Sequence, residues 1–312
     1  MSKNNRWLAI VNLLSGSGKC GRDWEHIARM LYAKGIDFDT VFTGRRQHAI
    51  ELAQRGIIED GYRNIIAIGG DGTIHEVANG ILTQTEVPST DVRMGVVAVG
   101  TGNDWIRTYG IPRSYEGAVE VIAGGKELIQ DVAKATYINR QGMEESRYCV
   151  NVSGAGMDAA VNLKVCQMKD KGKNGMASYM MQLASSVFGY RSCPMSVKVD
   201  GKEVASGMIM SVSVGIGQYN GSGMQQLPLS KVDDGLLDCT VIDTMSAPKI
   251  ATVVGRLYDG KIYNVKKVHH YTGRQIEISA SDVREVEVDG EALGTTPVKY
   301  TIEEKRLRVL VP

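Results

Sequence analysis

A carboxylate set among glycines is the strongest chemical signal in this chain of 312 residues. An apolar run is followed at once by Gly69-Gly70-Asp71-Gly72-Thr73, which predicts a buried strand that ends in a tight turn. Glycines let backbone N–H groups come close to a ligand such as phosphate. A carboxylate beside phosphate is repulsive unless a cation or proton lies between them, so Asp71 suggests Mg²⁺ chemistry. The alternative is a structural turn in which Asp71 only accepts backbone N–H groups.

The residues after this turn predict a helix start. Thr73-Ile74-His75-Glu76 fits a capping box, in which Thr73 is the N-cap and the Glu76 side chain reaches back to it. Exposed N–H groups at a helix start attract phosphate. The turn and the helix together therefore form one candidate phosphate site.

Two other loops repeat the order of an apolar run followed by glycines and polar residues. The sequence GTGND at 100–104 carries Thr101 and Asn103, which can hydrogen-bond phosphate or ribose. The polar, glycine-rich loop at 12–21 follows the first apolar run. Its GSGKC segment superficially suggests a Walker A loop, but Leu13 and Cys20 replace the glycine and the Mg²⁺-binding hydroxyl that this motif requires.

The elements that must position these loops alternate between strand and helix up to about residue 131. Apolar runs predict strands, and helical spacing of apolar residues predicts helices between them. This order implies a parallel sheet with helices on both faces, whose ligands lie beyond the carboxyl ends of the strands. The expected strands are 7–12, 38–43, 64–68 and 95–99, and the expected helices are about 24–32, 46–58, 74–82 and 116–123.

The rest of the chain has short segments of alternating apolar residues, which predict a mostly antiparallel β domain that forms a sandwich. A turn pair, Asp200-Gly201, marks one hairpin. One helix is expected over about 175–189. The expected strands are 196–199, 208–214, 236–242, 275–279, 283–288 and 298–302. We therefore expect an α/β domain over 1–131 and a β-sandwich domain over 132–303.

The composition is that of an ordinary enzyme and argues against a nucleic-acid-binding protein, a disulfide-rich protein and a membrane-spanning protein. A formal net charge of +1 argues neither for nucleic acid nor for strong attraction to an anionic surface. Five scattered cysteines without a C-x-x-C pair fit a reducing cytoplasm better than a disulfide framework. No apolar run approaches the ~20 residues that span a bilayer. The first apolar stretch is too short for a signal peptide and is better interpreted as a strand.

The turn and its continuation resemble a known family. The residues GGDGT at 69–73, followed by IHEVANG at 74–80, are similar to the diacylglycerol kinase catalytic-domain signature. That family includes diacylglycerol, sphingosine, ceramide and related lipid kinases, whereas NAD kinases and phosphofructokinases share only the GGDG core. The resemblance implies an NAD kinase-like α/β domain, a β-sandwich domain and a last strand, 304–312, that returns to the first domain.

The resemblance also implies a nucleotide site that uses ATP and Mg²⁺. The loop at 12–16 is similar to the N-P-x-S-G loop of lipid kinases, with Leu13 in place of proline. Asp131 lies where the family has an acidic residue that links the nucleotide and metal sites. The implied nucleotide-binding residues are Asn12, Ser15, Gly16, Thr43, Gly69, Gly70, Asp71, Gly72, Thr73, Glu76, Thr101 and Asn103.

Two acidic turns in the second half take their roles only from the resemblance. On residues alone, the turn at Asp234 would be a simple Asp-Gly turn. The family binds a structural Mg²⁺ in this loop, which implies a carboxylate ligand from Asp234 and backbone carbonyls from Lys231 and Leu236. The Asp289-Gly290-Glu291 turn resembles the D-G-E of the family, whose acidic residue is proposed as the general base. We assign this catalytic role to Glu291 and keep Asp289 as the rival.

Two further segments have competing interpretations. GAGMDA at 154–159 matches a dinucleotide fingerprint, but it lies outside the βαβ pattern, so a tight turn in the second domain is favoured. The apolar segment 175–190 follows Lys169, Lys171 and Lys173. Packing as a core helix is favoured there, and a membrane-docking surface is the minority hypothesis.

These features predict an ATP-dependent lipid kinase that transfers the γ-phosphoryl group to a lipid hydroxyl, with diacylglycerol as the expected acceptor. One alternative is a nucleotide-substrate kinase of the NAD kinase type. Another is a catalytically silent regulator that binds nucleotide without turnover. The expected partners are a lipid alcohol and a membrane surface contacted peripherally from the cytoplasm, a homodimer is compatible with the sequence, and nucleic acid is not expected.

Overall fold

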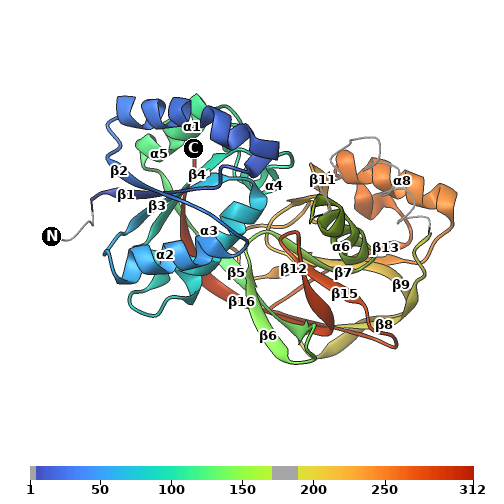
Figure 1. The fold of residues 1–312 in the computed structure, drawn as a ribbon. Helices are drawn as coiled ribbons and strands as arrows, with labels where there is room; N and C mark the ends of the chain where they lie inside the picture. Colours follow the sequence, from blue (N-terminus) through green and yellow to red (C-terminus); the bar gives the residue numbers. More distant parts are fainter. Residues whose placement is uncertain (1–4, 171–188) are drawn as a thin grey trace. The chain divides into compact units, whose positions relative to one another are not determined.

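The computed structural model describes residues 5–170 and 189–312. The chain divides into two units (Figure 1). Unit 1 contains the residues up to Val132 together with Glu304–Pro312, and unit 2 contains Ala133–Glu303. Lys171, Lys173 and nearly all of the expected helix at 175–189 lie outside the described residues.

Unit 1 alternates strands and helices. In chain order it contains β1 (Trp7–Val11), α1 (Ser15–Ala33), β2 (Phe38–Phe42), α2 (His48–Ile58), β3 (Asn64–Gly69), α3 (Asp71–Thr83), the 3₁₀ turn η1 (Ser89–Asp91), β4 (Arg93–Ala98), α4 (Asp104–Thr108) and α5 (Tyr115–Gly124). Two strands belong to both units, β5 (Glu127–Asn139) and β16 (Glu291–Leu310).

The sheet of unit 1 is parallel, with the order β2-β1-β3-β4-β16. Its strands are apolar runs because a parallel sheet covered on both faces buries every side chain of its central strands. Every residue of β1 and β3 is buried. Helices α1 and α5 contact each other, as do α2 and α3, and Figure 1 shows the two pairs on opposite faces of the sheet. This is the doubly covered α/β fold expected from the sequence.

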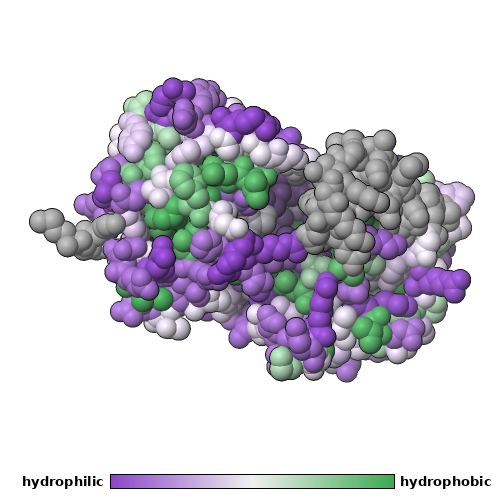
Figure 2. Space-filling view, viewed as in Figure 1, coloured by the Kyte–Doolittle hydropathy of each residue, from purple (hydrophilic) through white to green (hydrophobic). Residues whose placement is uncertain are grey.

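The outer face of unit 1 is largely hydrophilic. Figure 2 shows polar residues over α1 and α2, with apolar surface between these two helices. Leu14 and Phe42 are large apolar side chains that are exposed in this unit, at 81% and 46%. Leu14 follows β1 and Phe42 is the last residue of β2, so both lie at the carboxyl edge of the sheet, where ligands bind in folds of this kind.

Unit 2 is mostly antiparallel β-structure. Its further elements are β6 (Glu144–Cys149), β7 (Val152–Gly156), α6 (Met157–Asp170), β8 (Cys193–Val199), β9 (Lys202–Gly215), β10 (Tyr219–Asn220), β11 (Met224–Gln225), β12 (Leu237–Asp243), α8 (Ala247–Tyr258), η2 (Ile262–Asn264), β13 (Val268–Gly273), β14 (Gln275–Ala280) and β15 (Glu285–Val288).

Two long strands close the sandwich of unit 2. The first part of β9 pairs with β8, and its second part pairs with β7 and β12. Likewise β16 pairs first with β15 and then with β14. Each strand therefore contributes to both layers, which pack over a shared core that includes Tyr137, Ile209, Val241 and Tyr300. The antiparallel sandwich is confirmed.

Three expectations for unit 2 were wrong in detail. Helices α6 and α8 are present in the described residues although neither was expected. Strands β5, β6 and β7 occupy a region for which no strand was expected. GAGMDA at 154–159 is not a tight turn: its glycines lie in β7, and α6 begins at Met157 directly afterwards.

Candidate functional site

Two loops of unit 1 are joined by side-chain hydrogen bonds at the carboxyl edge of the parallel sheet. The Gly70 N–H donates to Ser15 Oγ at 3.2 Å, and Asn12 Nδ2 donates to Thr73 Oγ1 at 3.1 Å. A Cβ on Gly69 would lie 2.4 Å from Thr73 Oγ1, so glycine is required for this close approach. The loop after β1 and the turn after β3 therefore form one surface.

The loop after β4 joins the same surface through Asp71. Asp71 Oδ1 accepts the backbone N–H groups of Asp104 at 2.8 Å and Trp105 at 3.1 Å, in the first turn of α4. A Cβ on Gly100 would lie 2.8 Å from the Cα of Gly70. The two glycine loops are thus in direct contact, and the Asp71 carboxylate holds them together.

Asp71 is partly buried beside a second carboxylate. Burial and the nearby charge of Asp104 raise its pKa, and backbone N–H donors from residues 103–105 offset part of that effect. These donors show that the structural role considered for Asp71 is real. A catalytic role is compatible with it, because a carboxylate has several acceptor positions.

Asn103 has a buried side-chain oxygen at this edge that accepts no hydrogen bond from the described residues. Its side chain is 5% exposed, and its Oδ1 has no hydrogen-bond partner in the part of the chain that the structure describes. Asn103 also has a positive φ of 50°, as does Ser17, at 57°, in a non-helical break over residues 16–18 near the start of α1. Such backbone is strained for residues other than glycine and is often found at functional sites. An orphaned buried acceptor fits a donor supplied by a ligand, such as a ribose hydroxyl.

The capping box predicted at Thr73 is wrong. Helix α3 begins at Asp71, and Gly70 is its N-cap residue. Glu76 turns to α2 instead, where its carboxylate accepts the N–H groups of Gln47 at 2.9 Å and Ala49 at 3.1 Å. The orphan N–H groups of α2 attract this carboxylate, because the residue at the start of α2 offers no side-chain cap.

The remaining nucleotide-site residues in unit 1 have weaker support. Thr43 follows β2, and its N–H donates to the Val11 carbonyl at 3.0 Å, which places Thr43 beside the end of β1. Thr101 is exposed in the loop after β4. Asp131 is fully buried and accepts the Lys305 N–H at 2.7 Å, so it holds the returning end of the chain.

In unit 2, the Asp289–Gly290 turn joins β15 to β16. Both residues have positive φ, 49° and 86°, as the two-residue turn of a tight hairpin requires. Asp289 accepts the N–H groups of Val150 at 2.8 Å and Asn151 at 2.9 Å. Its carboxylate is therefore committed to holding another loop, while Glu291 is the first residue of β16 and is only half-buried.

Comparisons with known proteins agree with this arrangement. The family model "Diacylglycerol kinase catalytic domain" matches residues 6–135, and "YegS C-terminal NAD kinase beta sandwich-like domain" matches residues 151–311. The chain belongs to the diacylglycerol kinase family. The "Diacylglycerol kinase" of Bacillus subtilis is 25% identical over 291 residues, which cover 92% of this chain and 91% of that protein. A similar relative from Staphylococcus saprophyticus is 24% identical, and the match covers 97% and 94% of the two chains.

Solved structures show the same fold. A crystal structure from Bacillus anthracis, proposed to be a diacylglycerol kinase, has a TM-score of 0.78 at 24% identity and covers 100% of this chain and 97% of its own. A yeast NADH kinase complexed with NADH has a TM-score of 0.55 at 12% identity, covering 99% and 84%. The chain is therefore a kinase of lipid-kinase type built on the NAD kinase-like fold.

The loop predicted to hold a structural Mg²⁺ lies before β12 of this kinase. Asp234 is exposed, and its Oδ1 accepts the Leu236 N–H at 3.2 Å, which forms a local turn. A carboxylate from Asp234 with carbonyls from Lys231 and Leu236 would be a set of hard oxygen donors, which suits Mg²⁺. No group of three or more His, Cys, Asp or Glu side chains that could hold a metal ion is found in residues 5–170 and 189–312, so a cation at Asp234 or Asp71 would depend on carbonyls, water or phosphate.

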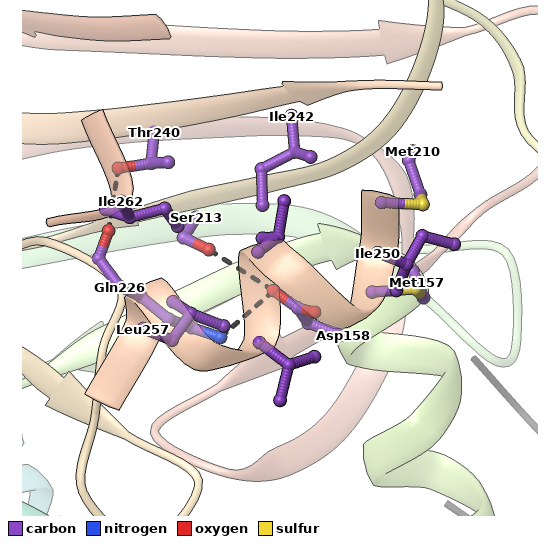
Figure 3. A pocket seen from close by; sticks show the side chains of 12 residues that line it. Met157, Asp158, Met210, Ser213, Gln226, Thr240, Ile242, Ile250, Leu257 and Ile262 are labelled. Atoms are coloured by element: carbon purple, nitrogen blue, oxygen red, sulfur yellow. Dashed lines mark hydrogen bonds between the residues drawn. The ribbon is translucent and has the colours of Figure 1, made fainter. Parts of the chain in front are cut away.

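A small cavity in unit 2 of the kinase was not predictable from any sequence motif. It has a volume of about 30 Å³ and lies between α8 and the sheet (Figure 3). Its apolar wall includes Met210, Ile250 and Leu257. Its polar end includes Asp158, whose Oδ2 accepts Gln226 Nε2 at 3.1 Å and Ser213 Oγ at 3.3 Å.

Asp158 is a functional candidate that the sequence interpretation missed. Burial raises the pKa of its carboxyl, and hydrogen bonds to its oxygens offset part of this effect. Buried carboxyls with a raised pKa are concentrated at functional sites. The sequence feature that could have identified Asp158 is the GAGMDA segment at 154–159. We interpreted this segment as a turn, whereas it is the end of β7 followed by the first turn of α6, which contains Asp158.

Proposed function

We propose that this kinase transfers the γ-phosphoryl group of ATP to the hydroxyl of a lipid alcohol, with diacylglycerol as the expected acceptor and phosphatidic acid as the product. The observation that carries the proposal is the Asp71 carboxylate, which lies where the two glycine loops meet at the edge of the parallel sheet. Loops at this edge of an α/β sheet are where phosphates bind.

ATP would be bound by backbone and polar side chains of unit 1. N–H groups at the start of α3, such as those of Asp71 and Gly72, and N–H groups of the loop after β1 would face its phosphates, and the Asn103 oxygen would accept a hydrogen bond from the nucleotide. Mg²⁺, held through Asp71 together with phosphate and water oxygens, would neutralise charge on the transferred group. The chain's own contribution is position and electrostatics, because phosphoryl transfer needs little covalent help from a protein.

The acceptor proposal rests on unit 2. The cavity between α8 and the sheet has an apolar wall and a polar end with Asp158 and Gln226, which matches a lipid with one polar group. Its volume is about that of one water molecule, so an acyl chain would require α8 to move outward. Val254 and Tyr258 on α8 are exposed, at 39% and 59%, and would suit contact with a lipid surface. No helix in the described residues is long and apolar enough to cross a bilayer.

Glu291 is the proposed general base of this reaction. A base must take the proton from the acceptor hydroxyl as the phosphoryl group arrives. Glu291 is half-buried, so an acceptor hydroxyl can approach its carboxylate, whereas Asp289 accepts the N–H groups of Val150 and Asn151 and so has a structural role in holding that loop. The proposed Mg²⁺ at Asp234 would have a structural role in unit 2.

A nucleotide-substrate kinase remains the main competing function, because the NAD kinase fold is shared. The apolar wall of the cavity favours a lipid, since a nucleotide acceptor would need polar partners there. A silent regulator would bind ATP without turnover.

The deciding experiment offers the purified kinase labelled ATP, Mg²⁺ and one acceptor at a time: diacylglycerol, ceramide, a sphingoid base and NAD. Label in phosphatidic acid supports the proposal. Label only in a nucleotide product, or ATP binding without transfer to any acceptor, would contradict it.

A further inference from the structure

Glu287 is a buried carboxylate that the proposed reaction leaves without a role. It lies on β15, and its side chain is 1% exposed. Its Oε2 accepts the Gly290 N–H at 2.6 Å, which is a short hydrogen bond to the turn that precedes Glu291. A buried carboxylate is costly to a fold, so its contacts should reveal what it contributes.

A β-bulge lies beside this residue. The register of β15 against β16 shifts between Val286 and Glu287: Val286 pairs with Gly294, whereas Glu287 pairs with Ala292. A bulge inserts an extra residue into one strand and re-aims the side chains next to it. The orientation of Glu291 therefore depends on a short hairpin that is irregular at one end and is held at its turn by Glu287.

The other oxygen of Glu287 is linked through Asn220 to Gln226, which lines the cavity in unit 2. Asn220 Nδ2 lies 3.4 Å from Glu287 Oε1 and 3.4 Å from Gln226 Oε1. Gln226 in turn donates to Asp158 at 3.1 Å, and both of these residues line the cavity. Polar side chains thus connect the cavity wall to the hairpin turn, with the 2.6 Å bond at Gly290 as the tightest contact.

We propose that Glu287 is a positioning residue, which holds the Asp289–Gly290 turn so that Glu291 is oriented to accept the proton of the lipid hydroxyl. The inference rests on the proposed function, because Glu287 acts through Glu291. It also assigns the cavity end, Asp158 and Gln226, to the same connected set of side chains.

The charge state of Glu287 determines which variant can replace it. Burial, together with the charges of Asp289 and Asp158, raises the pKa of Glu287 well above its ordinary value. A glutamine at this position keeps an oxygen for the Gly290 N–H without the charge. Leucine removes the acceptor at similar size, and asparagine keeps a polar group that is one methylene too short.

The experiment compares Glu287→Gln, Glu287→Leu and Glu287→Asn with Glu285→Leu, a matched control on the same strand. We expect Glu287→Leu and Glu287→Asn to lower kcat for lipid phosphorylation about 10-fold or more, since small misplacements of reacting groups can cost ~10²-fold. The KM for ATP should stay unchanged. Glu287→Gln should retain most activity, and Glu285→Leu should match the wild type.

A double-mutant comparison separates positioning from general damage. In a Glu291→Gln background, Glu287→Leu should cause no further loss of kcat, because its target is already removed. The proposal is overturned if Glu287→Leu lowers kcat by the same factor in the Glu291→Gln background as in the wild type. It is also overturned if kcat is unchanged in both Glu287→Leu and Glu287→Asn. If Glu287→Leu does not fold, the asparagine variant decides by the same criteria.

Hydrogen exchange keeps this test separate from the proposed function. The Gly290 amide should exchange at least about 10-fold faster in Glu287→Asn than in the wild type and Glu285→Leu, because its acceptor is lost. If the wild type phosphorylates no lipid, the proposed function fails by itself. Unchanged exchange at Gly290 would then still refute the contact on which the role of Glu287 depends.

Discussion

The Asp71 carboxylate accepts the backbone N–H of Asp104 at 2.8 Å, and this bond joins the turn after β3 to the start of α4. One side chain therefore has two roles. It stabilises the contact between two loops, and it brings negative charge to the edge where phosphates are proposed to bind.

These two roles of Asp71 can be separated by substitution. Asp71→Asn keeps an oxygen for the Asp104 N–H but loses the charge that would hold Mg²⁺, so we expect a folded protein with at least ~10²-fold lower turnover. Asp71→Ala should additionally lose about 1 kcal/mol of stability, as capping residues do when truncated. Turnover assays and urea denaturation check both. Near wild-type turnover of Asp71→Asn at saturating Mg²⁺ would show that the motif is misassigned.

Glu291→Gln should lower kcat by ~10²–10⁴-fold, the usual effect of losing a general base, with little change in ATP binding. Single-turnover kinetics and ATP titration measure the two quantities. Asp289→Asn is the matched control, and we expect it to affect stability more than chemistry, because Asp289 accepts N–H groups at residues 150 and 151. A rate loss confined to Asp289→Asn would transfer the role to Asp289.

Asp234→Ala tests the proposed structural Mg²⁺. We expect a lower thermal midpoint that added Mg²⁺ no longer raises, whereas Mg²⁺ should raise that of the wild type, because a ligand that binds the folded state stabilises it. Asp233→Ala, one residue earlier, serves as the control. Equal Mg²⁺ responses in the wild type and Asp234→Ala would argue against this site.

The buried carboxyl groups of unit 2 should make the free energy of unfolding depend on pH. Glu287 and Asp158 have a raised pKa in the folded protein, mainly through burial, with Asp289 also facing Glu287. A raised pKa means that the folded chain binds more protons than the unfolded chain. Their contribution to stability is therefore full below the ordinary pKa values, 3.8 for Asp158 and 4.5 for Glu287, and is lost as pH rises through each folded-state pKa.

We expect the wild type to lose unfolding free energy from this source as pH rises above these ordinary values, and Glu287→Gln and Asp158→Asn to lose less. Urea denaturation at a series of pH values measures this loss. A variant that loses more stability than the wild type over this range would contradict the assignment.

Sequence patterns predicted those elements in which the burial of the side chains follows a simple rule along the chain. The apolar runs of β1 and β3 are buried on both sides, so their pattern alone predicts a covered parallel sheet. Helix α8 could have been found as well, since Ile250, Val253, Val254 and Leu257 follow helical spacing. Helix α6 has no such stripe, because polar and apolar residues are spread around it.

The site was predictable where its residues are neighbours in sequence and not where they meet through the fold. The glycine turn and Asp71 were found from their order. The Glu76 carboxylate accepts an N–H group at the start of α2, and the Asp289 carboxylate accepts one from the loop before β7. Both contacts join residues that are distant in the chain. Propensity and short motifs contain no information about such contacts, so the roles of these two carboxylates required the three-dimensional structure.

Transfer of the ATP γ-phosphoryl group to a lipid hydroxyl is the reaction on which the proposed roles of Asp71 and Glu291 depend. The most direct measurement incubates the wild-type kinase with γ-labelled ATP, Mg²⁺ and diacylglycerol in detergent micelles, and then separates organic from aqueous products. Glu291→Gln and Asp71→Asn serve as controls. We expect label in the organic phase as phosphatidic acid, dependent on Mg²⁺ and reduced at least ~10²-fold in both variants. Label that stays aqueous with wild-type protein, or organic label that neither variant reduces, would overturn the proposed lipid kinase activity.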